Sequence, residues 1–272
     1  MTITILVDNN SGTDLADEHG LAFWIESGDR KILFDTGQGR ALPTNIEALG
    51  IDLEAADHVV LSHGHYDHAG ALPYVLERAT QAVVHMHPAA MEPRFNIHEG
   101  YVRSIGLSAA SLAALEALPK ARKSTVTETV ELAPGIGLTG PVPRLTSFED
   151  TGGPFFRDPY GDVPDPIIDD LSLWVDTPAG LMVCLGCAHA GVVNILTHIR
   201  QVTGRDRVDT IVGGMHLITA DEARLQATVA ALREIAPRRI VPCHCTGDAA
   251  TEMLVSELGD MVTPGQSGQV WS

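Results

Sequence analysis

Apolar residues along the chain follow two periods, which predict a protein of interspersed strands and helices. Residues 1–7 alternate in the manner of a half-buried strand, whereas residues 220–235 place alanine, leucine and valine at helical spacing. Short apolar runs bounded by turn residues predict the other strands. The predicted strands cover residues 1–7, 20–27, 31–35, 57–61, 81–86, 124–126, 129–132, 135–139, 172–176, 180–185, 208–212, 239–242 and 265–271. The predicted helices cover residues 43–49, 72–78, 108–118, 192–201, 220–235 and 248–258.

Turn and capping residues set the expected boundaries. Gly50 is suited to close one helix and Ser108 to cap the start of another, which Pro119 ends. Residues 88–100 show no period and are expected to be irregular. Residues 141–166 hold six prolines and several aromatics. A connection this long predicts an ordered lid or substrate loop, with a tolerated surface insertion as the alternative.

Length and charge narrow the class of protein. We expect the 272 residues to form a single domain with two similar halves, about 1–130 and 131–272. The net charge of −17 argues against a general nucleic-acid partner, because phosphate backbones attract lysine and arginine. The sequence starts without a signal-peptide pattern and has no apolar run long enough for a bilayer, so we expect a cytoplasmic protein without a membrane partner.

Four cysteines lie in the second half, at positions 184, 187, 243 and 245. Their spacing differs between the two pairs, so reduced thiols are expected, and a structural zinc held by four cysteines is the alternative.

Residues that can bind a metal ion are most concentrated in the sequence HxHxDH (residues 63–68). This sequence lies on a loop between a predicted strand and a predicted helix. His63 and His65 are two residues apart, so in an extended segment both side chains point the same way and can bind one metal ion. Asp67 and His68 follow where the chain turns, and they could hold a second ion. Imidazole suits zinc and iron. A neighbouring carboxylate makes the second site a harder ligand set, in the sense of hard and soft metal ligands.

This run resembles the signature of the metallo-β-lactamase superfamily. Residues 32–37 and 240–244 resemble its early and late strands, which end in a structural aspartate and a ligand histidine. The phrases at residues 18–21, 186–191, 213–217 and 242–247 are similar to a narrower branch. That branch contains the archaeal dihydropterin–ribofuranosylaminobenzene phosphate synthases and related metal-dependent hydrolases. The resemblance implies an α/β fold, an αββα four-layer sandwich of two mixed sheets flanked by helices, with its site at the seam between the halves.

The resemblance also implies the remaining site residues. His244 matches the last ligand of the superfamily. The usual middle ligand is missing, because no histidine lies between Arg122 and Asp176, and His189, in a glycine-flanked loop after residues 182–185, is the candidate to replace it. Most members place a bridging aspartate there, whereas this chain has Cys187 near His189, either a soft ligand or a packed thiol. Asp35 is expected to orient ligand histidines. His216 and His19 are each open between a role in the cleft and a structural one.

The expected activity is that of a metal-dependent hydrolase or transferase, which uses a metal-bound hydroxide on a small anionic or pterin-like substrate. Two divalent ions are expected, zinc first, with manganese or iron as alternatives, or a single ion. Asp67 would orient the nucleophile and accept its proton, and His216 would stabilise an oxyanion or protonate the leaving group. The arginines that could attract an anion are Arg94, Arg103, Arg144 and Arg157.

Three alternatives stay open from the sequence. The first is a phosphodiesterase or lactone hydrolase of the same fold, and the second is an oxidoreductase with a single iron. The third is a metal-binding or scaffold protein without catalysis. The substrate and the oligomeric state do not follow from these residues.

Overall fold

The computed structural model describes residues 1–12 and 14–272, which group into two compact units. The first unit comprises residues 1–126, 154–169 and 266–272, and the second unit comprises residues 127–153 and 170–265. The expectation of a single domain with halves near residue 130 stays a prediction.

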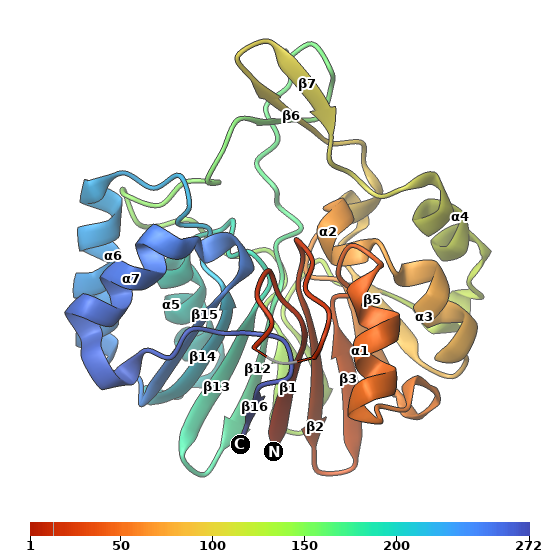
Figure 1. Cartoon of the computed structure of the whole chain (residues 1–272), viewed down its shortest axis with the longest axis horizontal. Helices are drawn as coiled ribbons and strands as arrows, with labels where there is room; N and C mark the ends of the chain where they lie inside the picture. Colours follow the sequence, from red (N-terminus) through yellow and green to blue (C-terminus); the bar gives the residue numbers. More distant parts are fainter. Residues whose placement is uncertain (13) are drawn as a thin grey trace. The chain divides into compact units, whose positions relative to one another are not determined.

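A seven-stranded mixed sheet forms the centre of the first unit, in the order β16-β1-β2-β3-β4-β5-β8 (Figure 1). β16, β1, β2 and β3 pair antiparallel, whereas β3, β4, β5 and β8 pair parallel. The strands are β1 (Thr2–Val7), β2 (Ala22–Ser27), β3 (Arg30–Phe34), β4 (His58–Val60), β5 (Val83–Met86), β8 (Lys123–Thr125) and β16 (Val270–Trp271).

The predicted strand over residues 265–271 was too long, because β16 comprises only Val270 and Trp271, although Gly268 and Gln269 also exchange backbone hydrogen bonds with Ile5 of β1. Gly268 has a φ of 91°, and the Gln269 N–H returns to the carbonyl of Gln266. This turn takes the preceding residues out of the extended conformation.

Helices cover the apolar core of the first unit. They are α1 (Ala41–Leu49), α2 (Tyr66–Ala69), α3 (Leu72–Arg78) and α4 (Ala109–Ala117), with the 3-10 turns η1 (Leu53–Ala55), η2 (Pro88–Met91) and η3 (Lys120–Arg122). Leu33, Val59 and Leu72 belong to this core and are fully buried. Both predicted caps are confirmed, since Gly50 ends α1 with a φ of 66° and the Ser108 hydroxyl accepts the N–H of Ser111.

A small three-stranded sheet corrects the expectation that residues 88–100 are irregular. β6 (Phe95–His98) and β7 (Tyr101–Ser104) form a hairpin, and β11 (Phe155–Phe156) pairs with β6. The hairpin is olive-yellow in Figure 1. Its residues are half-buried or exposed, so the only strand signal in the sequence is the short apolar–polar alternation over residues 95–98. Part of the predicted lid, residues 154–166, therefore belongs to the first unit, and a lid role for 141–166 stays a prediction.

The second unit has a six-stranded mixed sheet in the order β15-β14-β13-β12-β10-β9. The predicted hairpin of β12 and β13 is confirmed, and β13, β14 and β15 run parallel. The strands are β9 (Val130–Ala133), β10 (Ile136–Leu138), β12 (Ser172–Thr177), β13 (Gly180–Leu185), β14 (Val208–Gly214) and β15 (Arg239–Cys243). The helices are α5 (Val192–Thr203), α6 (Glu222–Ile235) and α7 (Asp248–Leu258), with the 3-10 turns η4 (His244–Thr246) and η5 (Gly259–Met261).

The three helices of the second unit lie over its sheet, and their apolar faces form its core (Figure 1). All seven residues of β14 are buried, as is typical of a parallel strand in the middle of a covered sheet. Across the described residues, no helix has both the length and the apolar character needed to cross a membrane.

Candidate metal centre

The HxHxDH loop (residues 63–68) follows β4 and runs into α2, which contains Asp67 and His68, and its histidines are buried. The Ser62 hydroxyl is 2.6 Å from Asp35 Oδ2 and 2.8 Å from His63 Nδ1. Because a carboxylate only accepts, Ser62 donates to Asp35 and accepts from His63 Nδ1. The lone pair of His63 is therefore on Nε2, which lies 2.9 Å from His65 Nδ1.

Asp35 also contacts His68, in agreement with the orienting role that the resemblance implied. His68 Nδ1 donates to Asp35 Oδ2 at 2.7 Å, and the Ser62 N–H donates to Asp35 Oδ1 at 2.7 Å. Both ionisable side chains are inaccessible to solvent. A histidine that donates through Nδ1 presents the lone pair of Nε2, the form in which imidazole binds a metal.

His19 is the residue that sequence reasoning left open and that the structure places beside the loop. Its Nε2 lies 3.0 Å from Asp67 Oδ2, and its side chain is 54% exposed while that of Asp67 is 9% exposed. The neighbouring Glu18 fixes this position, because its carboxylate accepts four backbone N–H groups, those of Gln38, Gly39, Arg40 and Ala41. The signal in the sequence was the position of His19 between Glu18 and Gly20, directly before a predicted strand.

In the second unit, His189 lies in the loop after β13 and is fully buried. Its Nδ1 donates to the carbonyl of Thr151 at 2.7 Å, so its lone pair is on Nε2. The His216 ring packs against the His189 ring with 4.4 Å between centroids. Gly152 makes room for His216, since a Cβ there would lie 2.1 Å from His216 Nδ1.

His244 opens η4 directly after β15 and is buried. Cys187 and Cys245 lie close in the same unit, with the Cys245 Sγ 3.7 Å from the Cys187 carbonyl oxygen. All four cysteines are buried thiols in the structure, and burial raises the pKa of Cys184 far above its usual range.

Left-handed backbone recurs at these positions. Asp35, Ala188, His216 and His244 have φ values of 60°, 55°, 44° and 47°. Such values cost non-glycine residues about 1–3 kcal/mol each and persist where the surrounding structure enforces them, often at functional sites. Each of the four lies just beyond the end of a strand, so the strain accompanies the turns that aim these side chains.

Other histidines are held away from this chemistry. The half-buried His58 and the buried His85 form a pair, with His58 Nδ1 3.0 Å from His85 Nε2. Burial, and then the neighbouring His58, lowers the pKa of His85 to about 4. His198 contacts the carbonyl of Thr139 at 3.2 Å, and His87 accepts the N–H of Ala89.

The donors in the first unit fit a divalent metal. Two nitrogens bound to one zinc ion at about 2.0–2.1 Å in tetrahedral geometry lie roughly 3.3 Å apart. His63 Nε2 and His65 Nδ1, at 2.9 Å, are near that separation. Imidazole nitrogens with an adjacent carboxylate are a donor set that zinc, manganese and iron accept.

Comparison with known proteins decides the family. The family model described as the metallo-β-lactamase superfamily matches residues 15–197. The chain belongs to the metallo-β-lactamase superfamily. A curated relative in Methanocaldococcus jannaschii is 30% identical over 250 residues, which are 88% of this chain and 85% of the relative. That relative is named 7,8-dihydropterin-6-methyl-4-(β-D-ribofuranosyl)-aminobenzene-5'-phosphate synthase.

Solved structures agree with the superfamily assignment. One described as a metal-dependent hydrolase of the β-lactamase superfamily has a TM-score of 0.84 and 29% identity, covering 100% of this chain and 98% of its own. The zinc-bound protein PqqB from Methylobacterium extorquens has a TM-score of 0.56 at 12% identity, covering all of both chains, and shows the fold alone. The predicted superfamily, its branch and the fold class are thereby confirmed. Members of this superfamily depend on metal ions.

Proposed function

We propose that this protein is a metal-dependent hydrolase or transferase acting on a small anionic or pterin-like substrate. The observation that carries the proposal is the preset tautomer of three buried histidines. Asp35 and Ser62 set it for His63 and His68, and the Thr151 carbonyl sets it for His189. Structural histidines do not need their lone pairs arranged in this way, whereas metal ligands do.

The proposed ligands follow the sequence pattern. His63 and His65 would hold one ion, and Asp67 and His68 a second. His189 and His244 would complete the coordination. Zinc is the first candidate for both ions, with manganese and iron as alternatives. Cys187 is not assigned a role.

The proposed catalytic groups are Asp67 and His216. When bound, such ions lower the pKa of water toward neutrality and polarise the bond to be broken. Asp67, which lies 3.0 Å from His19 Nε2 through its Oδ2, would orient the attacking oxygen and accept its proton. His216 would donate to the oxygen on which charge develops.

The arginines differ in how far their charge is already balanced. Arg94 pairs with Asp165 and Asp169, and Arg157 pairs with Glu92 and Asp165. Arg103 instead lies 4.9 Å above the Tyr66 ring, counted to its centroid, and donates to the Tyr66 hydroxyl at 2.8 Å. Tyr66 is part of the HxHxDH loop, so Arg103 is the first-unit arginine that we assign to an anionic substrate.

The relatives support the reaction class without fixing the substrate. One is named as a synthase that makes a dihydropterin phosphate compound, and another is described as a metal-dependent hydrolase. We propose a substrate of that pterin-like, anionic kind. Action on a small molecule in the cytoplasm, rather than on nucleic acid, is part of the same proposal.

The deciding experiment measures metal content by elemental mass spectrometry in the wild type and in His189→Ala, with His198→Ala as the matched control. The proposal expects two zinc or manganese ions in the wild type and in the control, and fewer in His189→Ala. Turnover of phosphodiesters or lactones by the metal-replete protein would select the hydrolase alternatives. A single iron with oxygen consumption would replace the proposal by an oxidoreductase, and full inactivity over a broad panel would indicate a non-catalytic protein.

A further inference from the structure

A buried carboxylate outside the ligand set touches the HxHxDH loop. Asp169 is inaccessible to solvent, and its Oδ2 accepts the Gly64 N–H at 2.8 Å. Gly64 is the residue between His63 and His65, so this hydrogen bond acts on the main chain that carries both imidazoles. Both Gly64 and Asp169 belong to the first unit.

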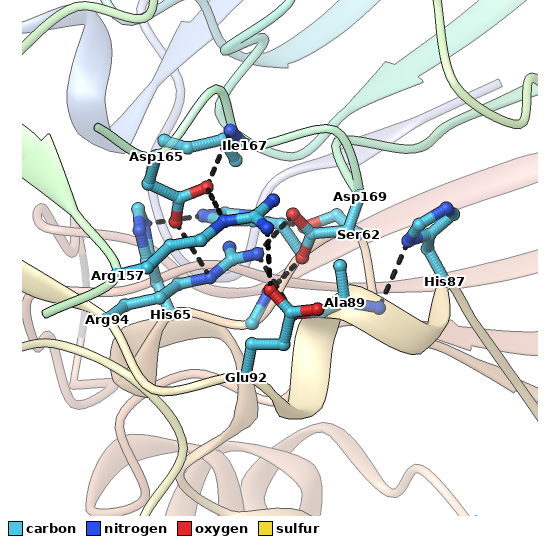
Figure 2. Close-up of polar contacts among 12 residues, drawn as sticks. Ser62, His65, His87, Ala89, Glu92, Arg94, Arg157, Asp165, Ile167 and Asp169 are labelled. Carbon is cyan, nitrogen blue, oxygen red and sulfur yellow. Dashed lines mark hydrogen bonds and ion pairs between the residues drawn. The ribbon is translucent and has the colours of Figure 1, made fainter. Parts of the chain in front are cut away.

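Asp169 is itself fixed by Arg94, a large side chain that is almost fully buried, with 1% of its surface exposed. Figure 2 shows the Arg94 guanidinium between two carboxylates. Its terminal nitrogen donates to Asp169 Oδ1 at 2.5 Å, and its Nε lies 3.2 Å from Asp165 Oδ2. Asp165 also accepts the Ile167 N–H at 2.9 Å. A buried arginine with two carboxylates restricts all three side chains to one geometry.

The same arginine nitrogen also contacts the η2 turn that packs against the loop. Arg94 donates to the carbonyl of Ala89 at 3.1 Å, in the η2 turn. Gly64 is seated against that turn so closely that a Cβ on it would lie 2.1 Å from the Ala90 carbonyl oxygen. The Gly64 main chain is therefore in close contact with both η2 and the Asp169 carboxylate.

The segment 154–169 makes a second contact with the loop. The Phe155 ring on β11 packs against the His65 ring, with 5.4 Å between centroids. One segment thus touches the ligand loop at the His65 side chain and at the main chain of the preceding residue.

We propose that Asp169, held by Arg94, is a positioning residue that sets the spacing of the His63 and His65 nitrogens. The inference rests on the proposed metal function. The next residue, Asp170, makes the same kind of contact within the second unit. Its Oδ2 accepts the N–H of Ala190, the residue after His189, at 2.8 Å. Two consecutive aspartates thereby each bind the main chain next to a candidate ligand.

The competing explanation is that Asp169 only stabilises the fold, as buried ion pairs elsewhere do. Asp209 offers the matched control in the second unit. It is 5% exposed in its side chain, and Arg238 donates to it twice, at 2.8 and 2.9 Å. It accepts no main-chain N–H in the HxHxDH loop.

The test compares Asp169→Asn, Asp169→Ala and Asp209→Asn with the wild type. Asn keeps an acceptor for Gly64 and loses the charge, whereas Ala loses both. In the metal-free proteins, amide exchange of Gly64 by NMR should quicken by at least about tenfold in Asp169→Ala, less in Asp169→Asn and not in Asp209→Asn. Cobalt titration should show affinity lower by roughly 10- to 100-fold in the same order, with an altered visible absorption spectrum.

The outcomes separate this inference from the proposed function. Wild-type cobalt affinity and spectrum in a folded Asp169 variant would overturn the inference and leave the metal function standing. Failure of the wild type to bind cobalt or zinc would overturn both. Should Asp169→Ala not fold, Asp169→Asn decides, because the lost charge must weaken cobalt binding there while Asp209→Asn only lowers stability.

Discussion

The two units orient their candidate ligand histidines by different means. In the first unit a side chain does so, since the Asp35 carboxylate contacts His68 directly and His63 through Ser62. In the second unit the main chain does so, since the Thr151 carbonyl accepts a hydrogen bond from His189 Nδ1. A carboxylate can be lost by one substitution, whereas a carbonyl is lost only when the path of the chain changes.

The ligands also differ in how they are distributed. The four candidate metal ligands of the first unit lie within the six consecutive residues 63–68. In the second unit the ligand candidates His189 and His244 and the catalytic candidate His216 follow three separate strands, and His216 and His244 have left-handed backbone. The candidate residues of the first unit therefore form one short sequence motif. Those of the second unit are brought together only by the course of three loops.

The largest expected effect comes from removing one ligand in each unit. His63→Ala and His244→Ala should each reduce metal affinity by more than the roughly 100-fold that an outer partner costs. Isothermal titration with zinc measures this, and His98→Ala on the exposed hairpin is the control. Wild-type affinity in His244→Ala would mean that the first unit binds metal without that residue.

Next in size is the loss of the orienting carboxylate. Asp35→Asn should lower the free energy of unfolding by about 2–3 kcal/mol, because hydrogen bonds to a buried charge are lost. Zinc affinity should fall by roughly 10- to 100-fold as the His68 tautomer is released. Thr151→Ala is the paired control, because its backbone carbonyl remains. Equal losses in both variants would contradict the proposed difference between the units.

The pH dependence of stability tests the role of His85, which pairs with His58 and is not a candidate ligand. The pKa of His85 is lowered to about 4, chiefly by burial and then by His58. The unfolded chain therefore binds more protons below pH 6.5, and stability that is present above this pH is lost as the pH falls toward 4. The loss should reach about 3 kcal/mol in urea unfolding of the wild type. His85→Gln should flatten this part of the profile, and an unchanged slope would contradict the assignment.

The smallest expected effect concerns the loop that supports His216. Gly152→Ala places a Cβ 2.1 Å from His216 Nδ1 at a φ of 84°, and should cost about 1–3 kcal/mol. Gly28→Ala is matched, because its φ is 62° and no atom lies within 4 Å of the added Cβ. Thermal unfolding of the two variants isolates the His216 contact. Equal shifts in Tm would show that only backbone strain matters.

Much of the fold could be predicted from the sequence where burial imposes a period. The hairpin of β12 and β13, the strand β14 and the caps at Gly50 and Ser108 each have a local signal. The hairpin of β6 and β7 had only a weak signal, because β6 is half-buried with a four-residue alternation and β7 is exposed. The missed strands are therefore those that no core requires.

The candidate site divides in the same way. The HxHxDH loop and Asp35 could be predicted because side chains carry their chemistry. The contact of His19 with Asp67 depends on Glu18 and four backbone N–H groups, and the setting of His189 depends on a carbonyl. Backbone donors and acceptors are the same at every residue, so the sequence does not reveal which of them a histidine will meet.

The division of the chain into units has a consequence for cutting it. The boundaries at 126/127, 153/154, 169/170 and 265/266 mean that the polypeptide passes from one unit to the other four times. A protease that nicks one of these links leaves three covalent connections intact. Producing the first unit in isolation would require splicing three segments, and the second unit two. Domain dissection by truncation is therefore the wrong tool for this protein, and split-fragment complementation across a single link is the suitable one.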